Sequence, residues 1–135
     1  DINSRADTIL ECVSFIESRS PQSAAAYTER LKQKISELAG DTSFDEGRLL
    51  TEVAIFADKI AVDEETVRLK SHISQLKSLL ETGGPIGRKL DFIVQEMNRE
   101  ANTIGSKAQD IEITRTVLDI KAEIEKIREQ IQNIE

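Results

Sequence analysis

One histidine and two closely spaced glutamates are the side chains best suited to acid–base or metal chemistry. His72 is the only histidine in the 135 residues, and an imidazole titrates near neutral pH. It could transfer a proton at a reacting oxygen or bind a metal ion; a polar position beside the core is the structural alternative. Glu96 and Glu100 are four residues apart, so on a helix their carboxylates could share a magnesium or manganese ion. Ion pairs with lysine or arginine on a neighbouring helix are the alternative for both glutamates.

Arginine and aromatic side chains lie in the same region. Arg88 and Arg99 fall on one helical stripe with Phe92. A guanidinium can bind phosphate while an aromatic ring stacks on an unpaired base, so this trio suits single-stranded RNA. Alternatively, Arg99 pairs with Glu96 or a neighbouring helix, and Phe92 is buried at a second helix contact.

Two carboxamides and a further arginine complete the candidate site. Asn98 and Asn102 share a stripe on which they could read base edges or link helices by hydrogen bonds. Arg68 lies on the helical stripe of His72, one turn before it. If the ligand is RNA, the residues that we expect to contact it are Arg68, Asn98 and Asn102, together with Arg88, Phe92 and Arg99.

The helix that carries most of these residues has an unusual composition. Gly83, Gly84 and Pro85 predict the end of one helix and the start of another. An apolar stripe then follows at helical spacing: Leu90, Ile93, Val94, Met97, Ala101 and Ile104. Between these positions the segment is rich in Asn, Gln, Thr, Arg and Glu. Asn and Thr lower the helix propensity, and a polar surface kept at that cost is typical of a functional surface.

The stretch GPIGRKLDFIVQEMNREANTIGSKA resembles the signature of the YicC/YloC family of bacterial proteins, which are described as metal-dependent endoribonucleases that prefer single strands. The likeness extends upstream through EVAIFADKIAVDEETVRLKSHISQLKSLL and downstream through EIEKIREQIQNIE. The resemblance covers essentially the whole chain but only the carboxy-terminal half of such a protein. It implies a cytoplasmic homo-oligomer that cleaves single-stranded RNA with a manganese or magnesium ion.

Composition limits the class of protein. Hydrophobic residues make up 39% of the chain, charged residues 32% and aromatic residues 4%, which favours a helical protein over one built from sheets. The single cysteine, Cys12, excludes an internal disulfide and suits a reducing compartment. No apolar run is long enough for a membrane span, and we expect neither a membrane nor DNA as a partner.

Charge is distributed unevenly along the chain. The net charge of −7 argues against a general nucleic-acid binder. Residues 66–107, however, contain seven basic and four acidic residues, which gives +3 locally and leaves −10 for the remainder. A weak phosphate-binding surface in this region is one explanation, and ordinary scatter of charge is the other.

The amino-terminal part predicts one or two helices. An apolar stripe in residues 1–19 continues with the same period to about residue 39: Ile2, Ala6, Ile9, Val13, Ile16, Ala24, Tyr27, Leu31, Ile35 and Leu38. Ser20 and Pro21 favour a stop or a kink between two helices, but one long helix fits the pattern equally well.

The middle of the chain predicts a turn and two helices. Residues 40–44 read as the turn, and Asp45 could cap a helix with the stripe Leu49, Val53, Phe56 and Ile60. Asp63 could cap the next, whose inward residues would be Leu69, Ile73, Leu76 and Leu80. Gly105 and Ser106 could break the following helix or merely bend it.

The carboxy-terminal helix has the clearest pattern, a heptad stripe of Ile113, Val117, Ile120, Ile124, Ile127, Ile131 and Ile134. Such a stripe needs a partner. We therefore expect an all-α, elongated helical bundle in which this helix packs antiparallel on the amino-terminal helices. Ile120 and Ile127 should contact residues such as Ile9, Val13, Leu31 or Ile35; a self-associating coiled coil is the second choice.

Several candidate residues should lie at similar positions along two neighbouring helices. The Gly83–Pro85 turn is short, so the helices on either side should be antiparallel neighbours. His72 and Glu96 each lie about three turns from it, and Arg68 and Glu100 would match one turn further on. The sequence therefore permits a cluster of His72, Arg68, Glu96, Arg99 and Glu100.

The expected domain organisation has two parts. Residues 1–39 and 109–135 would form a helical hairpin or stalk, and residues 45–108 would carry the signature. We expect the whole to be the carboxy-terminal domain of a larger two-domain protein, whose amino-terminal domain lies outside this chain.

Two functions follow from the resemblance. The first is a metal-dependent endoribonuclease with His72, Glu96 and Glu100 as catalytic residues and the two glutamates as metal ligands. The second is a non-catalytic helical module that assembles subunits or clamps RNA and needs the absent domain for activity.

Overall fold

Residues 1–39 and 46–134 are described in a computed structural model of this chain, and they form five α-helices without a strand. The helices are α1 (Ile2–Ala39), α2 (Glu46–Ile60), α3 (Asp63–Thr82), α4 (Gly87–Lys107) and α5 (Ile111–Ile134). The all-α class predicted from the sequence is confirmed. Among the described helices, none is long and apolar enough to cross a membrane.

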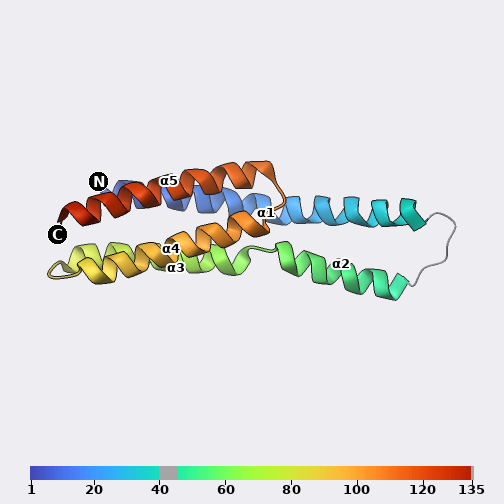
Figure 1. The fold of residues 1–135 in the computed structure, drawn as a ribbon, viewed down its shortest axis with the longest axis horizontal. Helices are drawn as coiled ribbons and strands as arrows, with labels where there is room; N and C mark the ends of the chain where they lie inside the picture. The colour runs from blue at the N-terminus through green and yellow to red at the C-terminus, as the bar shows by residue number, and fades with distance from the viewer. Residues whose placement is uncertain (40–45, 135) are drawn as a thin grey trace.

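Four of these segments form an antiparallel bundle (Figure 1). The amino-terminal half of α1, α3, α4 and α5 alternate in direction around a common core, and each packs on two neighbours. Ion pairs fix α1 against α5 in the antiparallel sense: Arg5 lies 3.1 Å from Glu123, and Arg19 lies 2.5 Å from Asp110. The predicted antiparallel packing of the last helix on the first is therefore confirmed.

The heptad stripe of α5 is the spine of the bundle core. Its six described members are all buried: Ile113, Val117, Ile120, Ile124, Ile127 and Ile131. They share one cluster with Ile9 and Val13 of α1, as predicted, and with the apolar stripes of α3 and α4. The sequence suggested two parts, one made of residues 1–39 and 109–135 and the other of residues 45–108. The core contains residues from both parts.

The helix α1 is continuous through Pro21, so the alternative of one long helix is correct. Proline has no backbone N–H, and at a helix interior it removes one bond to the preceding turn at a cost of about 3 kcal/mol. The apolar stripe keeps its period on both sides of the proline, from Ile16 to Tyr27. Burial of that stripe against α5 and then α2 offsets the lost hydrogen bond.

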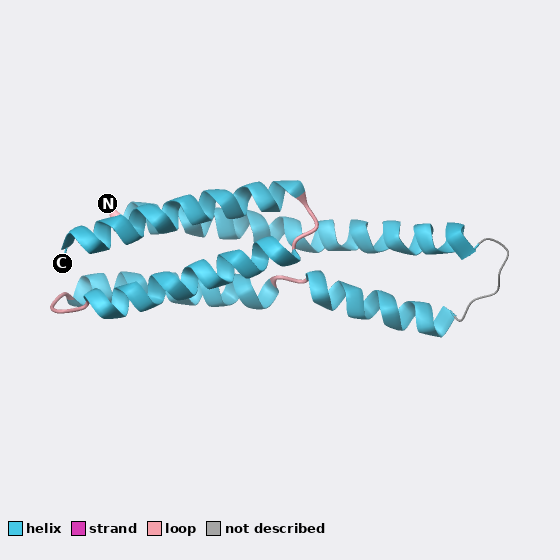
Figure 2. Ribbon diagram, in the orientation of Figure 1, coloured by secondary structure: helices cyan, strands magenta, loops and turns pink. Residues whose placement is uncertain are grey.

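Beyond the bundle, the second half of α1 and α2 form a two-helix arm (Figure 2). The predicted stripe of α2 is only half-buried at Leu49, Val53 and Phe56, and Ile60 at the bundle end is its buried member. Stacking of Phe56 on Tyr27, with ring centroids 5.4 Å apart, links the two helices. Two helices can cover each other on one side only, so their apolar stripes stay partly exposed.

The predicted contact of Ile120 and Ile127 with Leu31 and Ile35 is wrong. Leu31 and Ile35 lie in the arm, where they line a hollow with Val53 and other residues of α2. α5 covers the amino-terminal half of α1 instead (Figure 1).

Several predicted helix boundaries can be compared with the structure. Gly83 and Gly84 have φ angles of 72° and 81° and end α3, as their position predicted. Asp63 is the first residue of α3 rather than its cap; Val62 holds the cap position without a side-chain hydrogen bond. The predicted turn at 40–44 and the predicted cap Asp45 lie outside the described residues.

Gly105 lies inside α4, so it neither breaks nor ends the helix. A Cβ atom at this position would lie 3.3 Å from Cγ1 of Val117 on α5. The glycine thus allows α4 and α5 to approach closely.

Asp110 closes the connection between α4 and α5. Its Oδ1 accepts a hydrogen bond from the backbone N–H of Glu112 at 2.8 Å, which caps α5, and its Oδ2 accepts one from Arg19 Nε at 2.5 Å. The bond from Arg19 is the main reason that the pKa of Asp110 is lowered. One carboxylate therefore starts α5 and fixes that end of the bundle to α1.

We expect Ile120→Ala or Ile127→Ala to lower the free energy of unfolding by about 2–5 kcal/mol, because each removes a fully buried side chain from the core. Ile111→Ala on the same helix is the matched control, since Ile111 is 65% exposed. Chemical denaturation followed by circular dichroism measures the difference. Equal losses at positions 111 and 120 would contradict this packing.

Asp110→Asn should make the free energy of unfolding depend less on pH in the acidic range. A carboxyl whose pKa is lower in the folded state adds stability that is fully present above its unfolded value, about 3.9, and is lost as the pH falls through the folded value. Asparagine still caps the helix but carries no charge, so the difference between wild type and variant should shrink as the pH falls below about 4. Denaturation curves at several pH values test this, with Asp119→Asn on the exposed side of α5 as control.

Candidate functional site

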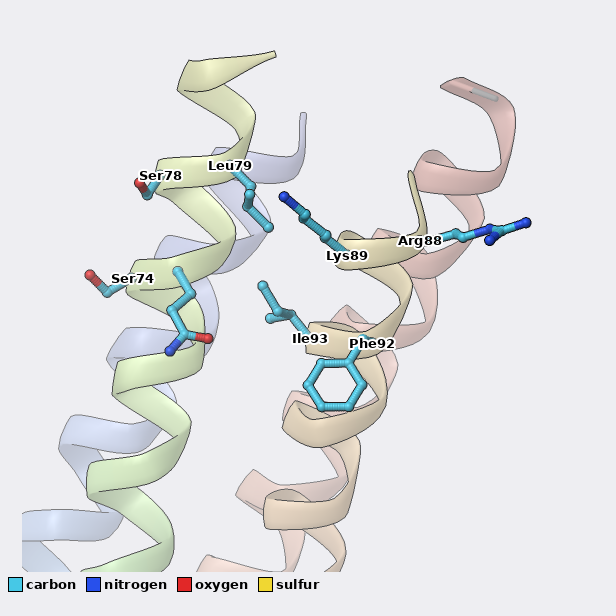
Figure 3. Close-up of a pocket in the computed structure, with 8 residues that line it drawn as sticks. Ser74, Ser78, Leu79, Arg88, Lys89, Phe92 and Ile93 are labelled. Atoms are coloured by element: carbon cyan, nitrogen blue, oxygen red, sulfur yellow. The ribbon is translucent and has the colours of Figure 1, made fainter. Parts of the chain in front are cut away.

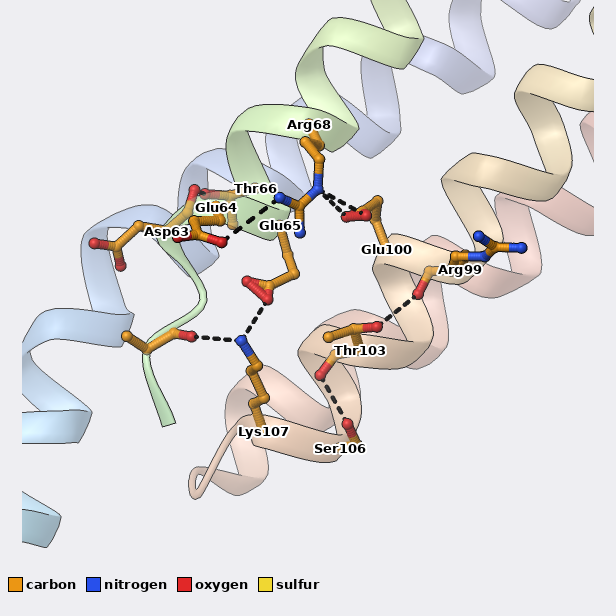
Figure 4. A network of polar contacts seen from close by, with 11 residues as sticks. Asp63, Glu64, Glu65, Thr66, Arg68, Arg99, Glu100, Thr103, Ser106 and Lys107 are labelled. Atoms are coloured by element: carbon orange, nitrogen blue, oxygen red, sulfur yellow. Dashed lines mark hydrogen bonds and ion pairs between the residues drawn. The ribbon is translucent and has the colours of Figure 1, made fainter. Parts of the chain in front are cut away.

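Two ion pairs run along the seam between α3 and α4 (Figure 4). Arg68 Nε donates to both carboxylate oxygens of Glu100, at 2.9 and 3.0 Å. Lys107 Nζ donates to Oε2 of Glu65 at 2.7 Å and lies 3.4 Å from the carbonyl oxygen of Ala61. Both glutamates are buried, with exposed fractions of 6% for Glu100 and 1% for Glu65. The bundle therefore has a polar seam (Glu65, Arg68, Glu100 and Lys107) beside its isoleucine core.

Arg68 is the cation of the seam with two acidic neighbours. The hydrogen bond to Glu100 is the main reason that the pKa of Arg68 is raised. Arg68 also lies 3.6 Å from Glu64, so it holds two carboxylates. A buried carboxylate that lost its partner would be left as an uncompensated charge, which destabilises a protein strongly. The predicted alternative, an ion pair across helices, is thus what Glu100 makes.

His72 lies at the middle of this face on α3. It is half-buried, and its Nδ1 atom is buried without a hydrogen-bond partner among the described residues. The Arg68–Glu100 pair sets the register of the two helices, and His72 and Glu96 are each one turn nearer the Gly83–Gly84 turn. Their predicted equal height follows from that register. Because Nδ1 is buried, a ligand on this face can meet only the exposed remainder of the His72 ring.

Glu96 is the least constrained carboxylate of the predicted set. Its nearest cation is Arg99 on the same helix, with NH1 of Arg99 3.7 Å from Oε1 of Glu96. This i,i+3 contact is the alternative predicted for Arg99. The side chain of Arg99 is 73% exposed, so most of it remains available to a ligand.

Glu96 and Glu100 stay a prediction as metal ligands, and they differ in what they already contact. Both oxygens of Glu100 are bound to Arg68, and Glu96 contributes a single carboxylate. Within residues 1–39 and 46–134, no group of three or more His, Cys, Asp or Glu side chains is arranged to hold a metal ion. The oxygen donors are of the right kind, and a cation here would share Glu100 with Arg68 and take further ligands from elsewhere.

A groove opens between α3 and α4 at the end nearer their turn (Figure 3). It has a volume of about 710 Å³ and is lined by Ser74, Gln75, Ser78, Leu79, Arg88, Lys89, Phe92 and Ile93. Phe92 is 62% exposed, so the predicted alternative of a buried Phe92 is wrong. Two cationic side chains and no acidic one line this groove, in a chain whose net charge is −7.

The structure divides the predicted RNA-binding residues into two groups. Arg88 and Phe92 both line the groove, although the side chain of Arg88 points away from α3 (Figure 3), whereas Arg68 and Arg99 lie two to three turns away along α3 and α4. Asn98 is half-buried and Asn102 exposed on α4, and neither carboxamide forms a hydrogen bond to another described helix. The predicted link between helices through these carboxamides therefore does not occur in the described part of the chain.

Three site residues were missed in the sequence. Lys89 adds a second cation to the groove, and Glu65 and Lys107 form the second buried ion pair. Glu65 shares the helical stripe of Arg68 and His72, and this spacing was the available signal. Its place in the first turn of α3 also gives it a favourable interaction with the helix dipole.

Comparisons with known proteins place this geometry in context. A family model described as "Endoribonuclease YicC-like, C-terminal" matches residues 16–135. The chain is 54% identical over 136 residues to a "Probable endoribonuclease YicC" of Clostridioides difficile (strain 630), covering 100% of this chain and 46% of that protein. It is 38% identical over 134 residues to the protein of the same name from Haemophilus influenzae, covering 99% of this chain and 46% of that protein. The chain thus spans about half the length of the curated relatives it matches.

Proposed function

This chain belongs to the family of YicC-like endoribonuclease carboxy-terminal domains, and from that premise we propose that it supplies the RNA-binding face and part of the catalytic apparatus of a cytoplasmic endoribonuclease. The proposed substrate is single-stranded RNA, and the proposed reaction requires a divalent cation. The two relatives are named as probable endoribonucleases, which supports RNA cleavage in general. The preference for single strands rests on the groove.

The groove between α3 and α4 is the observation that carries the proposal. An exposed ring such as Phe92 can stack on a base only if the base is unpaired and accessible, which favours a single strand over a duplex. Arg88 and Lys89 stand beside it and can bind the flanking phosphates. Gln75 on the opposite wall offers hydrogen bonds to the sugar or the base edge.

His72 and Glu96 lie next to the groove along the same face. Phe92 and Glu96 are one helical turn apart on α4, about 6 Å along the axis. A strand bound at Phe92 would bring its neighbouring phosphate to the level of His72 and Glu96. In that position His72 can take the proton from a ribose hydroxyl or return one to the leaving oxygen. Arg99, largely exposed, can offset charge on the phosphate.

The divalent cation remains a proposal for the whole protein. When bound, it would supply a Lewis acid or an activated water. We assign no catalytic step to a cation on Glu96 and Glu100, because Arg68 occupies both oxygens of Glu100. Its remaining ligands would come from the RNA, the other half of the protein or a second subunit.

A non-catalytic role is the second candidate. Both buried carboxylates of the seam are held by cations, as in a structural network, and the apolar stripe of the arm is only half-covered. On this alternative the chain would clamp RNA or assemble a homo-oligomer, and the catalytic groups would lie outside it.

The first test compares this chain with the full-length protein. If activity needs both halves, the isolated chain should fold but cleave a fluorogenic single-stranded RNA much more slowly at equal subunit concentration. The assays include manganese, with and without chelator, and a DNA oligonucleotide of the same sequence as control. Equal rates would place the entire catalytic apparatus in these 135 residues and refute the non-catalytic role.

Phe92→Ala should weaken binding of single-stranded RNA by about tenfold, because stacking on an aromatic ring contributes about 1–3 kcal/mol per base. Phe92→Tyr keeps the ring and should bind like the wild type. Fluorescence anisotropy at fixed salt measures both. Replacement of Leu118, another exposed hydrophobic residue but on α5, by alanine is the matched control. Unchanged binding by Phe92→Ala would exclude the groove as the base-binding site.

His72→Ala, Glu96→Gln and Glu100→Gln in the full-length protein test the catalytic assignments. Loss of a proton-transferring group should lower the rate constant by about 10²-fold or more, whereas loss of a structural ion pair changes stability rather than the chemical step. Each variant is checked for unchanged oligomer size, and Glu81→Gln at an exposed position of α3 serves as control. Near-wild-type rates in all three would show that this cluster is structural.

A further inference from the structure

The arm leaves apolar side chains exposed on both of its helices. A hollow of about 370 Å³ lies between the helices and is lined by Leu31, Ile35, Glu52, Val53, Ile55, Phe56 and Lys59. Three of the exposed large hydrophobic side chains also belong to the arm: Leu38 (80% exposed), Leu50 (60%) and Ile55 (46%). In Figure 2 the arm projects beyond the bundle, so within the described chain no further helix packs along it.

The charge of the arm differs from that of the rest of the chain. Residues 20–39 and 46–60 contain five basic and five acidic residues, a net charge of zero, so the −7 of the chain is carried by the remaining residues. Between two copies those remaining residues repel one another, whereas the arms do not. The charge balance therefore favours the arm as a contact between two copies.

The charges beside the hollow make this face complementary to itself. Glu52, Phe56 and Lys59 follow one another at spacings of four and three residues and therefore lie along one side of α2. Glu52 is three residues before Ile55, and Lys59 is three residues after Phe56. When two copies of α2 lie antiparallel about a twofold axis between Ile55 and Phe56, each Glu52 meets Lys59 of the partner subunit. Neither charged side chain forms an ion pair with another described residue, so both are available for this contact.

We propose that two copies of this chain pair through their arms, with α2 antiparallel to α2 of the partner subunit about this twofold axis. The paired arms form a four-helix bundle that covers Leu31, Ile35 and Phe56 of each copy. Two contacts between Glu52 and Lys59 border that core and select the antiparallel arrangement, because a parallel one would place like charges beside each other. The proposal rests on the homo-oligomer named above under the second candidate role, and it assigns the contact between the subunits.

This pairing has consequences for affinity and shape. α2 has 15 residues, about 22 Å at 1.5 Å per residue. The interface is therefore at the small end of specific protein contacts, and the dimer should dissociate in the micromolar range. The two bundles lie at opposite ends of the paired arms, which leaves both α3–α4 grooves uncovered (Figure 1).

Sedimentation equilibrium of the 135-residue chain over a wide range of concentrations measures the association, and an exchange of charges tests the register. Glu52→Lys places lysine against lysine at both contacts, and Lys59→Glu places glutamate against glutamate, so each should weaken association by about tenfold or more. An equimolar mixture of the two variants restores opposite charges and should associate like the wild type. The double variant Glu52→Lys with Lys59→Glu should do the same. Glu81→Lys on α3 and Lys126→Glu on α5 make the same changes at exposed positions outside the arm and are the matched controls.

Ile55→Ala tests the apolar part of the contact. It should weaken association without loss of helix content by circular dichroism, because Ile55 is already 46% exposed in the single chain. Leu118→Ala at an exposed position of α5 is its control. Small-angle scattering should show a dimer more elongated than the single chain.

The possible outcomes separate this proposal from the broader ones. If the wild type associates but the charge variants associate equally well, the arm is not the contact and a homo-oligomer remains. A mixture of the two charge variants that stays monomeric overturns the antiparallel register. A wild type that is monomeric at every concentration overturns both the proposal and a homo-oligomer built by this chain. Cleavage of RNA is measured separately and is not decided by any of these results.

Discussion

The isoleucine stripe of α5 determines the shape of this molecule. A helix that carries buried residues at every third or fourth position from Ile113 to Ile131 must be covered along its whole length. α1 and α4 flank α5, and α3 closes the ring, so the stripe is shielded from water along the bundle. Where α5 is absent, beyond the middle of α1, only α2 remains as a partner and the apolar side chains are half-covered. The difference between bundle and arm thus follows from the length of one stripe.

The polar seam exists because α3 and α4 have apolar residues on one side only. Leu69 and Ile73 of α3 point into the core, and Arg68 and His72, each one residue earlier, lie beside it. The ion pairs Arg68–Glu100 and Lys107–Glu65 are specific in register, since a slip of one turn would leave two buried carboxylates without partners. Hydrophobic burial brings the helices together, and these pairs fix their alignment. The same alignment brings His72 level with Glu96.

Helices and their buried faces could be predicted because apolar periodicity is a local property of the sequence. The heptad of α5 and the stripes of α3 and α4 were read correctly from spacing alone. Which helix covers each part of a stripe was harder to predict. Leu31 and Ile35 continue the period of Ile9 and Val13, and nothing in that period shows that α5 ends before it reaches them. Phe92 could not be classed as exposed without the groove around it. The pairing of Glu65 with Lys107 depends on residues 42 positions apart, and so on the register of two helices.

The α3–α4 face is cationic at the end near the Gly83–Gly84 turn and acidic at the other end. This difference limits the length of a polyanion that could lie along it. Lys89 stands at the cationic end, in the groove. Lys107 stands at the other end, where Asp58, Asp63, Glu64 and Glu65 line a hollow with it. Lys107 is 18 residues further along α4, about 27 Å at 1.5 Å per residue. Within that distance the field felt by a polyanion changes from attraction to repulsion. A polyanion on this face would therefore be attracted at one end and repelled at the other, which limits the length of the face that it could occupy.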